Sequence, residues 1–249
     1  MVNGILYSKK HNYAALYSSK AGCSSVRYLF MDLHNDELSE KDKVDYNRHD
    51  IKSMFPLKAD INTIPKFLVI RNPYLRVVSM FTSKFIGENN LLKRKFKKNN
   101  IICKNNSFLA FLNVLKDLTD KEILNKVDCH ISTQSHKIDF SLTNDKLNII
   151  DLDNFEEGIL KFYSKYYKHN ELYNKVKSII ADSNNYLHSN KTIKTSLYEN
   201  DDASKIEFND ISNIPPYKSF YINPKVKELV DYIYADDFKK FNYKMKLPF

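Results

Sequence analysis

The chain has 249 residues, 43% hydrophobic and 13% aromatic, which is enough for one sizeable α/β domain with a proper core. Only 4 Gly, 7 Pro and no Trp exclude collagen-like and glycine-rich architectures. The net charge of +9 favours anionic partners such as a nucleotide, nucleic acid, an acidic membrane or an acidic glycan, without choosing among them.

Cysteine usage and hydropathy narrow the class further. The three cysteines are an odd number without paired spacing, which argues against a disulfide framework and against a zinc site. No signal peptide is visible, and no stretch reaches 18 apolar residues. We therefore expect a cytoplasmic protein without a membrane segment. No Pro/Gly/Ser-rich linker divides the chain, so we predict a single domain over residues 1–249.

Two strand–turn–helix units open the chain. Residues 13–17 (YAALY) predict a short buried strand, and a helix is expected from Ser24 after a turn. Residues 66–70 (KFLVI) read as a strand of a parallel sheet buried on both faces. Asn72 then suits the N-cap of a helix that continues to residue 85, with Pro at its first position. Such units imply parallel strands joined by crossover helices.

The rest of the chain is less regular. The Lys/Asn-rich residues 90–106 favour a solvated loop or helix face, the alternative being a basic rim for an acidic acceptor. Further elements are predicted as helices at 107–118, 154–167 and 224–234 and a strand at 147–152, with residues 181–220 irregular. The predicted fold class is α/β: a three-layer sandwich around a central parallel β-sheet.

The first motif is the turn between the first strand and its helix. Free N–H groups and the helix dipole at this point attract anions. Gly22 permits a close backbone turn, Lys20 adds a full charge, and Ser24 and Ser25 add hydroxyl donors. The nucleoside-triphosphate loop and the dinucleotide fingerprint are excluded, because Lys20 precedes the glycine and no glycine pair has the required spacing.

The second motif is RNPYLRVVSMF, residues 71–81. Arg71 is placed at the carboxyl end of the second strand, where ligands bind in open parallel sheets. Ser79 lies two helical turns beyond Asn72, on the same face. An arginine and a hydroxyl in this relation suit a phosphate group.

Together the two motifs resemble those of sulfotransferases that use 3′-phosphoadenosine 5′-phosphosulfate (PAPS), especially the chondroitin- and uronyl-directed carbohydrate enzymes. The first resembles Pro-Lys-x-[AG]-[CST]-[ST]-[ST], with Ser19 in place of Pro, and the second R-[DE]-P-[YFI]-x-R-[LV]-[LV]-S-x-[YF], with Asn72 as its one departure. The resemblance implies that Lys20 contacts the transferring sulfuryl group, that Arg71 and Ser79 bind the 3′-phosphate, and that Arg76 makes a structural ion pair. The 5′-phosphosulfate is then cradled by Ala21, Gly22, Cys23, Ser24 and Ser25.

The resemblance also suggests which groups lie on the acceptor side. His49 stands 22 residues before Arg71, where several sulfotransferase groups carry a catalytic histidine, so it is our candidate general base. His130 is the rival, in a segment similar to D-x-H-[WF]-x-P-Q, where it and Gln134 either orient the acceptor or brace a loop. Residues 187–192 resemble a loop that closes over the nucleotide in the family, so Lys191 and Thr192 are expected to contact a phosphate.

These expectations define one leading function and three alternatives. The leading function is sulfuryl transfer from PAPS to a carbohydrate or glycan acceptor, including acidic ones, without a metal, on a fold like that of the P-loop nucleotide kinases. A nucleotide-dependent phosphotransferase is disfavoured by the missing Walker order. A basic nucleic-acid-binding protein is disfavoured because no helix-turn-helix or zinc pattern is found. The presence of Lys20, Arg71 and Ser79 argues against a non-catalytic relative that only binds nucleotide.

Overall fold

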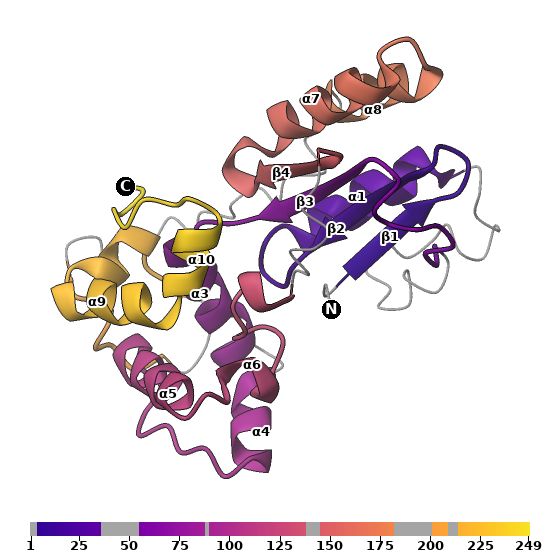
Figure 1. Cartoon of the computed structure of the whole chain (residues 1–249). Helices are drawn as coiled ribbons and strands as arrows, with labels where there is room; N and C mark the ends of the chain where they lie inside the picture. The colour runs from indigo at the N-terminus through magenta and orange to yellow at the C-terminus, as the bar shows by residue number, and fades with distance from the viewer. Residues whose placement is uncertain (1–3, 36–54, 88–89, 138–144, 182–200, 209–213) are drawn as a thin grey trace. The chain divides into compact units, whose positions relative to one another are not determined.

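The computed structural model describes residues 4–35, 55–87, 90–137, 145–181, 201–208 and 214–249. The chain forms two compact units, each built from two segments. We call residues 1–71 and 137–190 the sheet unit, and residues 72–136 and 191–249 the helical unit. The backbone leaves the sheet unit after Arg71 and returns at Lys137 (Figure 1). The single domain predicted for residues 1–249 remains a prediction.

The sheet unit contains a four-stranded sheet in the order β1-β2-β3-β4. Its strands are β1 (Gly4–Ser8), β2 (Tyr13–Tyr17), β3 (Lys66–Ile70) and β4 (Leu147–Asp151). Strands β2, β3 and β4 run parallel, which confirms the strands predicted at 13–17 and 66–70 and the one that begins at 147.

The parallel sheet has one antiparallel edge strand that was not predicted. β1, which the sequence analysis did not predict, pairs antiparallel with β2, from Gly4 opposite Tyr17 to Ser8 opposite Tyr13. An antiparallel neighbour needs only a short turn, whereas a parallel one needs a crossover. Asn12 takes a positive φ of 51° in that turn, a conformation that Asn tolerates well.

One helical layer of the sheet unit packs on a single face of the sheet. It comprises α1 (Cys23–Leu33), α7 (Phe155–Tyr167) and α8 (Glu171–Ala181), the last of which was not predicted. Alternate strand residues such as Tyr13, Ala15 and Phe67 share one buried cluster with these helices. The hydroxyl of Tyr163 in α7 donates to that of Tyr13 at 2.7 Å, which satisfies a polar group in an otherwise apolar core.

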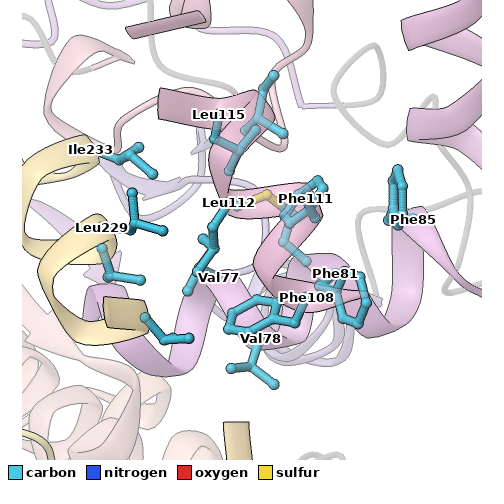
Figure 2. Close-up of a cluster of buried hydrophobic side chains, with 14 of the residues drawn as sticks. Val77, Val78, Phe81, Phe85, Phe108, Phe111, Leu112, Leu115, Leu229 and Ile233 are labelled. Carbon is cyan, nitrogen blue, oxygen red and sulfur yellow. The ribbon is translucent and has the colours of Figure 1, made fainter. Parts of the chain in front are cut away.

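The helical unit has its own aromatic-rich core. Its helices are α3 (Pro73–Met80), continued by a π-helical turn (Phe81–Phe85), and α4 (Leu91–Lys98), α5 (Phe108–Asp120), α6 (Leu124–Val127), α9 (Pro224–Ile233) and α10 (Ala235–Lys240). Figure 2 shows how Val77, Phe81, Phe111 and Leu229 meet, from α3, its π-helical continuation, α5 and α9.

The helix starts follow local signals. The side chains of Asn72, Ser107 and Asn223 accept hydrogen bonds from backbone N–H groups at the starts of α3, α5 and α9.

In the part of the chain that the structure describes, none of the helices has the length and apolar character of a membrane-spanning segment. The protein is thus a mixed α/β protein with a four-stranded sheet flanked by helices. The finer similarity to nucleotide kinases remains a prediction.

Candidate active site

In the sheet unit, two of the predicted anion-binding segments follow neighbouring parallel strands. The turn that contains Lys20 follows β2, and Arg71 follows β3. Tyr17, the last residue of β2, is paired with Val69 near the end of β3. Both segments therefore lie at the carboxyl edge of the sheet, the edge at which open parallel sheets bind ligands.

The turn after β2 has a backbone that depends on Gly22. Lys20 and Gly22 both adopt positive φ angles, of 64° and 74°. A Cβ atom at Gly22 would lie 2.5 Å from Cδ1 of Leu152, which is closer than van der Waals contact allows. The positive φ therefore favours glycine here, and a larger residue would also require the side chain of Leu152 to move; the turn leads directly into α1.

The N-terminus of α1 offers donors to an anion. Gly22 occupies its N-cap and no side chain caps the helix. The N–H groups of the first turn, which begins at Cys23, have no intrahelical acceptor, as in any α-helix, and here no side chain caps them. Ser24 is half-buried and Ser25 is buried. N–H groups, two hydroxyls and the nearby lysine suit a phosphate or phosphosulfate group.

Cys23 places a thiol in this turn. Burial acts to raise its pKa, but the charges of Arg27 and Lys20 outweigh that effect, and the pKa lies below its usual value. Nη2 of Arg27 donates to Sγ of Cys23 at 3.6 Å, and its Nε donates to the Cys23 carbonyl at 3.1 Å. Arg27, which the sequence analysis did not single out, is four residues beyond Cys23 and so shares its helix face.

The positive charge of Arg71 acts on Asp153, which follows β4. Burial and the neighbouring Asp151 raise the pKa of Asp153, and Arg71 opposes that rise. Ile70 is paired with Asp151, the last residue of β4, so Arg71 and Asp153 follow the ends of adjacent strands.

In the helical unit, Ser79 lies in the last turn of α3. Its carbonyl accepts the hydroxyls of Ser83 at 2.6 Å and Thr82 at 3.4 Å. Its own hydroxyl makes no hydrogen bond within the described residues and is half-buried. The helix changes to a π-helical turn at the next residues, a feature that is frequent at functional sites.

His130 forms a close pair with Asp128, also in the helical unit. The two atoms His130 Nδ1 and Asp128 Oδ1 are 2.7 Å apart, and the side chain of His130 is 20% exposed. Burial acts to lower the pKa of His130, but the hydrogen bond to Asp128 and the neighbouring Cys129 raise it to about 9. At neutral pH His130 is therefore an imidazolium ion.

The loop that carries His130 is braced by buried groups. Arg76 is buried and donates to the carbonyls of His130 at 3.1 Å and Ser132 at 2.8 Å. These two hydrogen bonds give Arg76 a structural role in the loop, and the ion pair expected for it remains a prediction. Gln134 is fully buried, and its N–H donates to Asp237 at 2.9 Å. This placement favours bracing over acceptor contact for Gln134.

The same loop has a donor set that could hold a metal ion. One ligand atom each from Asp128, Cys129 and His130 lie within 4.8 Å of one another in the described part of the chain. Two of these residues already form the close pair described above, so we interpret the cluster as an ion pair. The expectation of a metal-free protein remains a prediction.

Other predicted site residues cannot be compared. His49, Lys191 and Thr192 lie outside the described residues. Asp128 was given no role by the sequence analysis, although its position two residues before a histidine is a recognisable signal.

These features describe a mixed α/β protein in which groups of a kind that suits an anion follow the ends of parallel strands. A model of the sulfotransferase family matches residues 3–244, nearly the whole chain. The chain therefore belongs to the sulfotransferase family, and is a transferase that moves sulfuryl groups. Neither a curated protein nor a solved structure gives a significant match.

Proposed function

We propose that this protein transfers the sulfuryl group of PAPS to a hydroxyl group of a carbohydrate acceptor. The observation that carries the proposal is that the Lys20 turn and Arg71 follow adjacent parallel strands. The donor set fits the nucleotide: uncapped N–H groups and Lys20 suit its 5′-phosphosulfate, and Arg71 suits its 3′-phosphate. By the family motif, Ser79 is a second contact for that 3′-phosphate.

The reaction is an in-line displacement at sulfur. The acceptor oxygen forms a bond to sulfur while the bond between sulfur and the bridging oxygen breaks, and a base takes the proton of the acceptor hydroxyl. The leaving adenosine 3′,5′-bisphosphate gains negative charge, which Lys20 stabilises. Every group used here belongs to the chain or to the two substrates.

His49 is the proposed base, and His130 has a different role. With a pKa of about 9, roughly one His130 in a hundred is neutral at pH 7, which makes it a poor base there. Its imidazolium ion is instead suited to hold an acceptor oxygen or an acidic group of the acceptor.

The positive charge of helix α4 favours an acidic acceptor. Arg94, Lys95, Lys97 and Lys98 are exposed, whereas Leu92 and Phe96 are buried. Of these residues, Lys95 is close enough to the His130 loop for its charge to contribute to lowering the pKa of Asp128. An acceptor that places its hydroxyl near His130 would thus bring its acidic groups within reach of α4.

The test of the donor is a thermal-shift titration with adenosine 3′,5′-bisphosphate, ATP and adenosine 5′-phosphosulfate. A ligand at 100 times its Kd should add about 2.7 kcal/mol of stability. We expect stabilisation by the 3′-phosphorylated nucleotide alone, and its loss in Arg71→Ala. An equal shift with ATP, or no shift, would contradict the proposal.

The test of the acceptor uses α4 in a sulfation assay. In R94Q/K95Q/K98Q we expect the KM for uronate-containing oligosaccharides to rise several-fold and the KM for neutral ones to stay unchanged. The matched control is K121Q/K161Q/K168Q, which removes the same charge from other described positions. Equal effects of the two triple variants would refute a specific role for α4.

A further inference from the structure

The segment that joins α4 to α5 alternates between packed and exposed side chains (Figure 1). Asn100 turns the chain at the end of α4 with a positive φ of 55°, and the N–H of Ile101 bonds back to the helix at 2.8 Å. Ile101 and Cys103 pack against the core of the helical unit, whereas Ile102 and Lys104 are exposed. The core contacts therefore hold the backbone in place while two side chains face the solvent.

Ile102 is the most exposed large hydrophobic side chain in the part of the chain that the structure describes. It is 84% exposed, whereas the others reach at most 52%. It borders a hollow of about 610 Å³ whose wall includes the half-buried Leu109 of α5. Lys104 and Lys205 line the same hollow, and Asp117 adds a carboxylate. Ile102 is thus part of a small apolar patch with ammonium groups at its border.

Further positive charge precedes Ile102 in the last turn of α4. Lys97 and Lys98 are exposed there, and neither they nor Lys104 have a hydrogen-bond or ion-pair partner for the side chain within the ranges that the structure describes. No Asp or Glu occurs from residue 89 to residue 116. We call Lys97, Lys98, Ile102 and Lys104 the α4–α5 surface. It combines unpaired cations with an exposed aliphatic side chain.

We propose that the α4–α5 surface binds a lipid bilayer that carries anionic headgroups. The ammonium groups contact the lipid phosphates, and Ile102 inserts among the acyl chains, where its apolar area leaves water. An acidic glycan or a nucleic acid would neutralise the same lysines, but neither offers an apolar environment to the isoleucine. The surface lies wholly in the helical unit and needs neither the nucleotide nor the acceptor of the proposed function.

The test is flotation of the full chain with vesicles of phosphatidylcholine, with and without phosphatidylserine, in the absence of any acceptor. We expect binding to the anionic vesicles alone, weakened by added salt. In K97Q/K98Q/K104Q the affinity should fall on the order of a hundredfold, at roughly fivefold for each charge. The matched control K121Q/K161Q/K168Q removes three exposed lysines from other positions and should bind like the wild type.

The insertion of Ile102 can be measured separately, because the chain contains no tryptophan. Ile102→Trp should give a single tryptophan emission that shifts to shorter wavelength on anionic vesicles and is quenched by brominated acyl chains. Ile222→Trp is the control: Ile222 is another exposed isoleucine of the helical unit, and its replacement should show no shift. Ile102→Ser should bind several-fold more weakly than the wild type, with an unchanged melting temperature.

The possible failures are distinguishable. A wild-type protein that does not bind anionic vesicles, or equal losses in the two triple variants, overturns the membrane proposal. Binding without a shift in the emission of Ile102→Trp overturns the insertion. Binding of duplex DNA or an acidic oligosaccharide that K97Q/K98Q/K104Q loses, without vesicle binding, assigns the surface to that partner instead. A protein that binds vesicles but not adenosine 3′,5′-bisphosphate refutes the proposed function alone.

Discussion

Asp128 accepts two hydrogen bonds from His130, one from its backbone N–H at 2.8 Å and one from ring Nδ1 at 2.7 Å. The pairing fixes the orientation of the imidazole within a single turn of chain. It leaves Nε2 as the ring nitrogen that can donate to a substrate. Because Asp128 stabilises the charged ring, the pair has consequences for stability as well as for binding.

Replacing Asp128 by Asn should change the pH dependence of folding. The pKa of His130 is raised to about 9, above its unfolded value near 6.5. The stabilisation is therefore fully present below pH 6.5 and is lost as the pH rises to 9. We expect the free energy of unfolding of the wild type to fall by up to about 3 kcal/mol over this range relative to Asp128→Asn.

Urea unfolding at pH 6 and pH 9.5 measures this difference. His169→Gln is the control, because His169 is exposed and far along the chain from Asp128. The interpretation of the pair is wrong if Asp128→Asn and the wild type lose stability in parallel as the pH rises.

The two arginines of one motif should separate stability from binding. Arg76→Ala leaves the carbonyls of His130 and Ser132 without their donor, and should destabilise the fold by about 3 kcal/mol. Arg71→Ala should unfold near the wild-type urea midpoint yet lose the affinity for adenosine 3′,5′-bisphosphate. Denaturant curves and titrations on both variants measure the two effects, and a stable Arg76→Ala would contradict the bracing role.

Gly22→Ala should damage the anion-binding turn in two separable ways. A φ of 74° is unfavourable for alanine by roughly 1–2 kcal/mol, and the added Cβ meets Leu152. The variant should therefore be less stable and bind the bisphosphate more weakly. In Gly22→Ala/Leu152→Ala the steric conflict is removed, so bisphosphate affinity should recover in part. A Gly22→Ala protein with wild-type affinity would show that the turn does not hold the nucleotide.

Cys23 should be alkylated before Cys103. The pKa of Cys23 is lowered despite burial, through Arg27 and Lys20, whereas burial raises the pKa of Cys103. Iodoacetamide at pH 7, followed by peptide mass spectrometry, should label Cys23 before Cys103. Adenosine 3′,5′-bisphosphate should slow that labelling because it covers the turn, and ATP should not. Faster labelling of Cys103 would contradict the lowered pKa of Cys23.

The sequence predicted the elements whose signals are local. The strands at 13–17 and 66–70 are uninterrupted apolar runs, and Asn72 with Pro73 marks the start of α3 as predicted. β1 was missed because its apolar residues are few and its stability comes from pairing with β2, a contact that no short pattern records. Because β1 was missed, the antiparallel edge of the sheet was not predicted either.

In the candidate site, too, some residues could be predicted from local sequence motifs and others only from the structure. Lys20, Gly22, Arg71 and Ser79 could be found because their spacing repeats a family motif on successive strand–helix units. The pairing of Cys23 with Arg27 depends on side chains that meet in three dimensions. The burial of Gln134 likewise depends on Asp237, which lies about a hundred residues further along the chain.

The route of the chain between β3 and β4 bears on how the protein is synthesised. β4 pairs with β3 only after the whole segment 72–136 has left the ribosome. Until then the apolar strand KFLVI presents an unpaired edge to other nascent chains, and such edges promote aggregation. We therefore expect the yield of soluble protein in a heterologous host to depend strongly on growth temperature and on chaperone supply.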